Sequence, residues 1–399
     1  MRQAPERFLA YGRQAIDEAD CQAVIDVLRS DFLTTGPAVA AFEEAFAAYV
    51  GCDHAVACAN GTAALHLAVM AAGLGPGDIG IVPANTFMAT ANALRFTGAE
   101  VVFADIDPAT GLMTAETLQL ALRRCDPSQV KAILPVHFAG HPVEMAAIKA
   151  IADQLGAVII EDSCHAIGTE LTGPDGSQQP IGAGAFGDFA TFSFHPVKTL
   201  ACGEGGMVTT NDPTAAHQLQ LLRSHGIERA AGAFKAPGHT NAPWYHEMHA
   251  LGFNMRLSDI HAALGLSQLT KLNQFVATRE ALVADYAKAL APLAPAVRLI
   301  SQPRAQRTGW HLLVVHIDFA ACGTDRAALM AALRQHNVGT QVHYIPVHHQ
   351  PYYREIYGDI SLPGAETYYA GALSLPLFVG MDTADVEHVA ASLQRCLSL

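Results

Sequence analysis

"HAVACANGTAALHLAVMAAG", residues 54–73, joins two different structural patterns in one short stretch. Its first seven residues are mostly apolar and β-prone, and a glycine then leads into an apolar run that is typical of a buried helix. Further β-prone runs alternate with helical runs along the chain, and they lie at 78–85, 100–107, 130–140, 157–163, 187–195 and 206–212. This alternation predicts an α/β fold with a mixed, mostly parallel sheet of about seven strands.

The pattern changes after residue 270. A long helix is predicted over 271–292, and a second mixture of strand and helix follows it. We therefore expect a large domain over 31–270 and a smaller α+β domain over 271–399, because a chain of 399 residues can build two cores. Residues 1–30 contain one amphipathic helix, which is expected to pack on either domain.

Composition excludes several classes of protein. The formal net charge is −13 and no basic run occurs, which argues against binding of nucleic acid. No apolar stretch reaches the roughly 18 residues of a membrane span, and the N-terminal sequence does not resemble a signal peptide, so we expect a cytoplasmic protein without a membrane partner. The eight cysteines are scattered, which indicates reduced thiols rather than disulfides.

Open α/β sheets bind ligands beyond the carboxyl ends of their strands. After the first predicted strand, Gly61 and Thr62 begin a helix whose N–H groups and dipole favour an anion, although an ordinary helix start would look the same. Phe87 follows the second strand and could equally belong to the core. Asp162 ends the strand at 157–163, where its carboxylate needs a cationic partner or the solvent of a surface turn.

One lysine suggests how these residues act together. Lys198 lies in "SFHPVKTLACGEGG" (193–206), after another predicted strand, in a chain that has only six lysines but 18 arginines. A lysine amine can form a Schiff base, whereas an arginine cannot act as a nucleophile. With Asp162 to keep a pyridine nitrogen protonated, Phe87 to cover the ring and Gly61 with Thr62 to hold a phosphate, the set predicts pyridoxal 5′-phosphate (PLP) as cofactor.

The sequence also resembles a known family over nearly its whole length. The similarity is carried by "FLTTGPAVAAFEEAFAAYVG" (32–51), "EDSCHAIG" (161–168), "FSFHPVKTLACGEGG" (192–206) and "LGFNMRLSDIHAALGLSQL" (251–269). These segments resemble the DegT/DnrJ/EryC1/StrS family of PLP-dependent nucleotide-sugar aminotransferases. The resemblance implies PLP-dependent transferase fold type I, like that of aspartate aminotransferase.

The resemblance implies roles for residues around the cofactor ring. Lys198 would form the Schiff base and then act as the acid/base catalyst, and Asp162 would contact the pyridine nitrogen. Phe87 would cover the ring and His165 would lie beside it. Some relatives carry histidine in place of the lysine and are sugar dehydratases, so Lys198 favours transamination, with pyridoxamine phosphate as the intermediate carrier.

The resemblance also implies contacts to the cofactor phosphate. Thr62, Ala63 and Ser193 would bind it within one chain. Asn254, in the "GFNMR" segment, would reach the phosphate of the neighbouring subunit's cofactor. The active unit is therefore expected to be a homodimer with shared active sites.

Three stretches of the sequence indicate which member of the family the chain resembles most. Residues 161–168, 338–359 and 365–378 look most like the pseudaminic acid pathway transaminase, which makes UDP-4-amino-4,6-dideoxy-N-acetyl-β-L-altrosamine from a 4-keto nucleotide sugar with glutamate as amino donor. This implies a ping-pong reaction. Arg229, His343 and Tyr344 are the candidate substrate contacts, although Arg229 could equally form an ion pair at a helix end.

The sequence leaves other functions open. The chain could aminate another 3-keto or 4-keto nucleotide sugar, or be a PLP-dependent dehydratase. A PLP-binding regulator is less compatible with the sequence, because no basic DNA-binding segment occurs. A nicotinamide enzyme is less compatible with it because the lysine, the carboxylate and the anion-binding loop all follow strands. We predict no metal site, since "HYIPVHH" (343–349) has no cysteine or carboxylate ligand at a fixed spacing.

Overall fold

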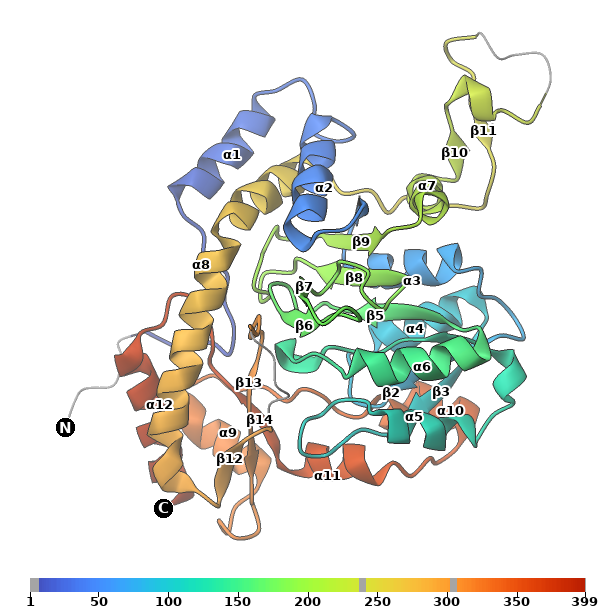
Figure 1. Cartoon of the computed structure of the whole chain (residues 1–399). Helices are drawn as coiled ribbons and strands as arrows, with labels where there is room; N and C mark the ends of the chain where they lie inside the picture. The colour runs from blue at the N-terminus through green and yellow to red at the C-terminus, as the bar shows by residue number, and fades with distance from the viewer. Residues whose placement is uncertain (1–6, 237–241, 302–306, 399) are drawn as a thin grey trace.

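The computed structural model describes residues 7–236, 242–301 and 307–398. Its centre is a seven-stranded sheet in the order β1-β9-β8-β5-β4-β2-β3 (Figure 1). The strands are β1 His54–Cys58, β2 Ile79–Pro83, β3 Glu100–Ala104, β4 Val130–Ile133, β5 Val158–Asp162, β8 Phe189–Ser193 and β9 Gly206–Thr210. Only β9 is antiparallel to its neighbours, β1 and β8. The predicted fold class and all seven predicted strands are confirmed.

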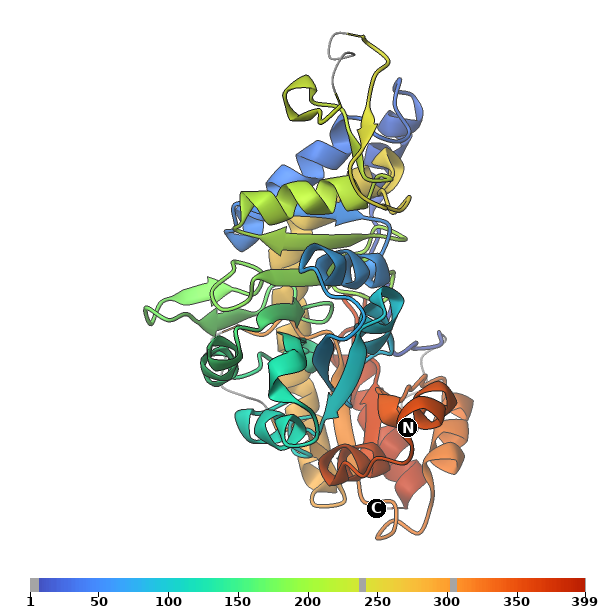
Figure 2. The same ribbon diagram turned by 90° about the vertical axis from the view of Figure 1, so that its right-hand side faces the viewer.

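Helices cover both faces of this sheet. Figure 2 shows α3 (Gly61–Ala71) and α4 (Ala89–Thr97) on one side of the sheet and α5 (Ala115–Leu122) and α6 (Met145–Leu155) on the other. At the β1 edge lie α2 (Pro37–Val50) and α7 (Pro213–Leu222). The sheet is therefore buried on both faces, which explains why its strands are almost entirely apolar.

One predicted strand is much shorter than its apolar run. Strand β4 ends at Ile133, whereas the apolar run extends to residue 140. Pro135 has no N–H to donate to a neighbouring strand, and its carbonyl instead accepts from the Asp162 N–H at 2.8 Å. A short 3₁₀ helix, Phe138–Gly140, follows.

A second core lies around a small sheet in the order β12-β13-β14. This unit contains β12 (Val297–Leu299), β13 (Leu313–Ile317), β14 (Ala372–Leu375), α9 (Arg326–Gln335) and α12 (Thr383–Leu397). Its apolar residues pack on the C-terminal half of the long helix α8 (Asp259–Leu290).

Helix α8 connects the two cores without a break. Leu272 and Val276 belong to the first core, whereas Leu282 and Tyr286 belong to the second. The predicted boundary between residues 270 and 271 therefore lies inside one continuous helix. The N-terminal helix α1 (Glu18–Leu28) packs on α8, where the buried Asp20 accepts hydrogen bonds from Ser267 and Gln268 and pairs with Lys271.

The structure also contains elements that the sequence did not indicate. They are the hairpin β6–β7 (Glu170–Thr172 and Gln178–Pro180), the ribbon β10–β11 (Ile227–Glu228 and Glu247–Met248), and the helices α10 (Pro351–Tyr357) and α11 (Pro363–Gly371). Tyr353 and Tyr368 of these two helices join the first core, so the chain returns to the large sheet before its last helix. No helix in the described part of the chain is both long and apolar enough to span a membrane.

Candidate active site

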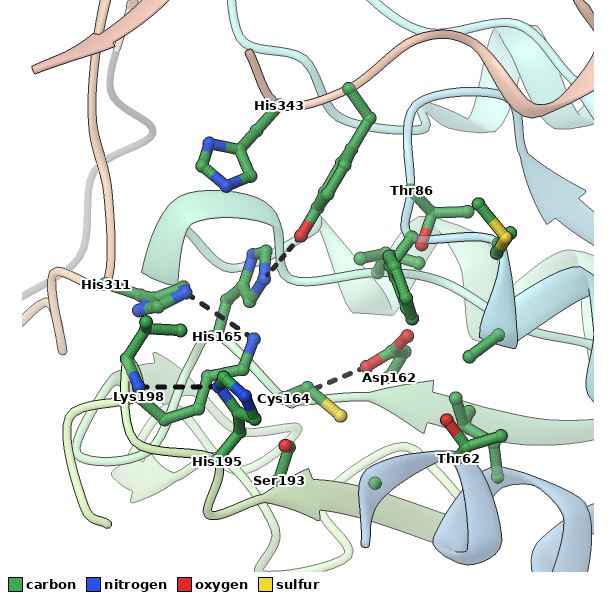
Figure 3. A pocket seen from close by; sticks show the side chains of 18 of the residues that line it. Thr62, Thr86, Asp162, Cys164, His165, Ser193, His195, Lys198, His311 and His343 are labelled. Atoms are coloured by element: carbon green, nitrogen blue, oxygen red, sulfur yellow. Dashed lines mark hydrogen bonds between the residues drawn. The ribbon is translucent and has the colours of Figure 1, made fainter. Parts of the chain in front are cut away.

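A cavity of about 560 Å³ lies at the carboxyl ends of the parallel strands. Its walls come from the loops after β1, β2, β5 and β8, together with the segment 341–350 that returns from the second core (Figure 3). The cavity brings together most of the residues expected to form the site: Gly61, Thr62, Phe87, Asp162, His165, Ser193, Lys198, His343 and Tyr344. Its volume is in the range of small-molecule sites.

Asp162 is held rigidly at the end of β5. Its side chain is 5% exposed. Oδ2 accepts a hydrogen bond from Thr90 Oγ1 at 2.7 Å, and Oδ1 accepts one from the Cys164 N–H at 3.2 Å. A buried carboxylate held by two donors keeps a fixed direction and can serve a cationic group of a ligand.

Lys198 approaches the same cavity from the loop after β8, the strand next to β5. Its backbone N–H donates to the His195 carbonyl at 2.8 Å, which closes a turn that begins before Pro196. Its Nζ lies 3.5 Å from His311 Nε2. Burial lowers the pKa of Lys198 below that of an ordinary lysine. A larger fraction of the amine is therefore neutral and nucleophilic near neutral pH.

Buried aromatic and imidazole groups form the wall beside Lys198. The ring centroids of His165 and His311 are 4.4 Å apart, and Tyr344 Oη lies 3.1 Å from His165 Nε2. The Ala139 N–H donates to His165 Nδ1 at 3.3 Å, which places the His165 proton on Nε2, facing Tyr344. Burial, together with the nearby Lys198 charge, holds the pKa of both histidines well below the ordinary value. The wall is therefore uncharged.

The first turn of α3 faces the other end of the cavity. Gly61 lies so close to Ser193 that a Cβ on Gly61 would be 2.7 Å from Ser193 Cβ, so only glycine fits there without a shift. Gly61, Thr62 and Ser193 line the cavity. The Ala63 N–H already donates to Asn60 Oδ1, the side chain that caps the helix. The Ala63 N–H, one of the expected phosphate contacts, is thus already used by the helix cap.

Three predicted residues do not line this cavity: Ala63, which is buried in the first turn of α3, Arg229 and Asn254. Arg229 is exposed just after β10, and Asn254 is exposed on the segment before α8, where it pairs with Ser224. Phe87 is at the cavity edge and is 51% exposed, with its ring centroid 6.1 Å from that of Tyr344.

These residues fit PLP on the chemistry of the donor set. A buried amine with a lowered pKa, a fixed carboxylate, an aromatic ring at the rim and the first turn of a helix surround one cavity. The glycine in that turn leaves room for a group to approach the backbone. Lysine, carboxylate, ring cover and anion site are the four features that PLP requires of a protein.

Sequence reasoning missed several residues of the cavity wall. Tyr11, His311 and Gln341 come from the N-terminal segment and from the second core, far from the large-domain motifs. His311 begins the apolar run "HLLVVHI", and a histidine at the start of a buried strand is the one sequence feature that could have suggested it. Contacts across two cores leave no periodic pattern in the sequence.

Known proteins resemble this chain over nearly its whole length. The DegT/DnrJ/EryC1/StrS aminotransferase family model matches residues 14–394. The spore coat polysaccharide biosynthesis protein SpsC of Bacillus subtilis (strain 168) is 39% identical over 98% of this chain and 97% of its own.

Solved structures agree with this match. The Helicobacter pylori aminotransferase PseC, involved in the biosynthesis of pseudoaminic acid, is 28% identical, with a TM-score of 0.87 over 98% of this chain and all of its own. The PLP form of the putative sugar aminotransferase Spr1654 from Streptococcus pneumoniae is 25% identical, with a TM-score of 0.86 over 98% of this chain and 99% of its own. The chain belongs to the PLP-dependent DegT/DnrJ/EryC1/StrS aminotransferase family.

Proposed function

We propose that this aminotransferase moves the amino group of L-glutamate to a 4-keto-6-deoxy nucleotide sugar, and that the acceptor is the UDP-linked precursor of 4-amino-4,6-dideoxy-N-acetyl-β-L-altrosamine. The observation that carries the chemistry is the meeting of Lys198 and Asp162, from neighbouring strands, in one cavity. The choice of sugar is supported by the similarity to PseC and by the resemblance of residues 338–359 and 365–378.

PLP, when bound here, supplies the aldehyde that takes up the amino group and the ring that accepts electrons from the donor carbon. Lys198 Nζ would hold the aldehyde, and Asp162 would keep the ring nitrogen protonated. Phe87 and His165 would cover and flank the ring. The first turn of α3, through Gly61 and Thr62, would hold the phosphate.

Lys198 would also move the proton in each half of the reaction. With its pKa lowered by burial, the neutral Nζ can take the proton from the α-carbon of glutamate. In the second half, the same amine delivers a proton to the sugar carbon that receives nitrogen. His311, 3.5 Å away and uncharged, can orient Nζ without competing for its proton. One cavity serves both halves, so 2-oxoglutarate leaves before the sugar enters, as in a ping-pong reaction.

The walls of the cavity suggest where the sugar would bind. His343 is buried beside Tyr344, and its Nδ1 forms a hydrogen bond with Ser374 Oγ at 2.8 Å. Burial lowers the pKa of His343 to about 3, so it acts as a neutral hydrogen-bonding group. Tyr344 shares the same wall. Both are proposed as substrate contacts, whereas Arg229 would have to act on the site of a second subunit, because it is exposed outside its own cavity.

We propose a homodimer in which each subunit completes the site of the other. Large apolar side chains are exposed in the segment after α1, at the rim of the cavity and between β10 and α8: Phe32, Leu33, Phe87, Trp244, Leu251 and Phe253. Contact with a second subunit would bury such side chains. Asn254 is exposed next to Phe253 in the last of these segments. Mixing Asn254→Ala with Lys198→Ala subunits should restore partial activity, since each mixed dimer has one intact site.

Substrate identity is tested by offering a panel of 3-keto and 4-keto nucleotide sugars with glutamate. Products are then identified by mass spectrometry and NMR. We expect amination of the UDP-linked 4-keto-6-deoxy sugar by the wild type and none by Lys198→Ala. Transfer only to a 3-keto sugar or only to a dTDP-linked sugar would contradict the proposed acceptor and leave the transaminase activity intact.

A second acceptor is favoured by one specific observation. SpsC, whose name refers to spore coat polysaccharide biosynthesis, is 39% identical, more than the 28% of PseC. An acceptor used for a surface polysaccharide is therefore the alternative that the panel must include. Lys198 argues against the dehydratase alternative, because that reaction was expected where histidine replaces the lysine. The cytoplasmic location stays a prediction from the sequence.

A further inference from the structure

A second group of reactive side chains lies on the outer side of the segment that forms one wall of the active-site cavity. His348 and His349 belong to a short 3₁₀ helix, Val347–His349, and Glu366 comes from the first turn of α11. Nitrogen or oxygen atoms from all three side chains lie within 4.8 Å of one another. They line a separate cavity of about 400 Å³. The proposed sugar amination uses none of them.

His348 is the most unusual member of this group. It is 1% exposed, and neither ring nitrogen has a hydrogen-bonding partner among the described residues. A buried polar group without a partner is costly, and native proteins rarely keep one without a reason. A neutral imidazole has one ring nitrogen whose lone pair is available to a ligand.

The charges around His348 and His349 suit a cation. Glu366 provides a carboxylate whose Oε1 lies 4.0 Å from His349 Nε2. Arg354, which lines the cavity, is paired with Asp359, with Nε and Oδ1 at 2.8 Å. Arg124 also acts on His348, but the carboxylates of Glu366 and Asp105 oppose its effect. Asp359 also lines the cavity. The one positive charge on the cavity wall is thus offset by a neighbouring carboxylate.

We propose that His348, His349 and Glu366 bind a Zn²⁺ ion, with water completing the coordination. Two imidazoles and one carboxylate form a ligand set that zinc accepts in a four-coordinate site with an open position. The sequence suggested no metal because it shows no carboxylate at a fixed spacing from the histidines. The fold supplies the carboxylate from a different helix.

Bound zinc would tether the 3₁₀ helix to α11. Val347 and Gln350, on either side of the two histidines, line the active-site cavity. The metal would therefore stiffen one wall of that cavity without touching the substrate.

The experiment measures zinc binding to the full, PLP-loaded protein after treatment with a chelator. Isothermal titration with ZnCl₂ should show one tight site in the wild type, and zinc should raise the unfolding temperature. His349→Gln and Glu366→Gln should each weaken binding by at least about tenfold and abolish that rise. Both side chains are partly exposed, so neither change buries a new group. His336→Gln, at the end of α9, is the matched control and should bind zinc like the wild type.

Zinc could instead bind to the imidazoles of the active-site cavity, so a further variant separates the two sites. His343→Asn should leave the tight site intact under the proposal. The proposal is overturned if the wild type binds no zinc, or if His343→Asn abolishes binding while His349→Gln and Glu366→Gln retain it. Amination assays on the chelator-treated protein are read separately, because the proposed sugar amination does not depend on this ion.

Discussion

Replacing Asp162 by asparagine isolates the electrostatic part of the mechanism. The variant keeps the shape and one hydrogen-bonding oxygen of the side chain but removes its charge. Asp162 is 5% exposed and is fixed by Thr90 and by the Cys164 N–H, so the geometry of the loop should survive. The expected result is a protein that still takes up PLP but aminates its acceptor very slowly.

The size of the loss follows from Coulomb's law. Two unit charges about 4 Å apart at an effective dielectric constant of about 20 attract each other by about 4 kcal/mol. Since about 1.4 kcal/mol corresponds to a tenfold change in rate, kcat should fall by about 10³-fold. Thr90→Val keeps the charge of the carboxylate but removes the hydrogen bond to it, together with the contact of the hydroxyl to Thr86 Oγ1. It should therefore cost about 1.5 to 3 kcal/mol, roughly 10- to 100-fold in rate, if that bond matters fully in the transition state.

The assay follows glutamate-dependent amination of the keto sugar by mass spectrometry, with visible absorbance as the measure of PLP uptake. Glu161→Gln is the matched control, because Glu161 is the preceding residue on β5 and its Oε2 pairs with His137 at 2.7 Å instead of lining the cavity. This control should lose thermal stability and keep kcat within a few fold. A kcat for Asp162→Asn within tenfold of the wild type would refute the assignment of Asp162.

Three further predictions test other parts of the structure. His311→Phe should lower kcat about tenfold, with PLP uptake unchanged, because it removes a nitrogen 3.5 Å from Lys198 Nζ. An unchanged kcat would contradict the proposed role of His311 in orienting Lys198. Gly61→Ala should weaken PLP binding in an absorbance titration, since its Cβ would lie 2.7 Å from Cβ of Ser193 at the end of β8. Gly232→Ala, with open space around it, should leave PLP binding unchanged. Burial lowers the pKa of His141 to about 4, below the 6.5 expected in the unfolded chain, so the folded state prefers the neutral ring. The free energy of unfolding should therefore fall by about 3 kcal/mol as pH falls from 7 to 4, and His141→Phe should fall less; equal losses in urea titrations would contradict this.

The large sheet could be predicted because its strands and turns depend on residues that are close together in the sequence. Buried parallel strands are apolar along their whole length, and the turns between strand and helix carry residues such as Asn60 and Gly61 whose conformation or capping is specific. The main residues of the candidate active site could be predicted from the sequence for the same reason. Asp162 ends one strand and Lys198 follows the next one, and the carboxyl ends of parallel strands meet at one edge.

The second core and the rest of the cavity wall could not be predicted in the same way. Helix α8 passes from one core to the other without any change in its pattern, so the composition of its sequence does not mark the division. His311 reaches Lys198 only because the second core packs against the large sheet. The pairing of His348 and His349 with Glu366 likewise depends on how α11 packs. These contacts are set by tertiary packing rather than by spacing.

The central claim is that Lys198 is the lysine to which PLP is attached. The direct measurement is to reduce the purified, yellow protein with borohydride, digest it and locate the phosphopyridoxyl group by mass spectrometry. The six lysines of the chain lie far apart, so the modified peptide identifies the site without ambiguity. We expect the group on the peptide that contains Lys198, and no modification in Lys198→Ala. A group on any other lysine, or a protein that takes up no PLP, would contradict the account.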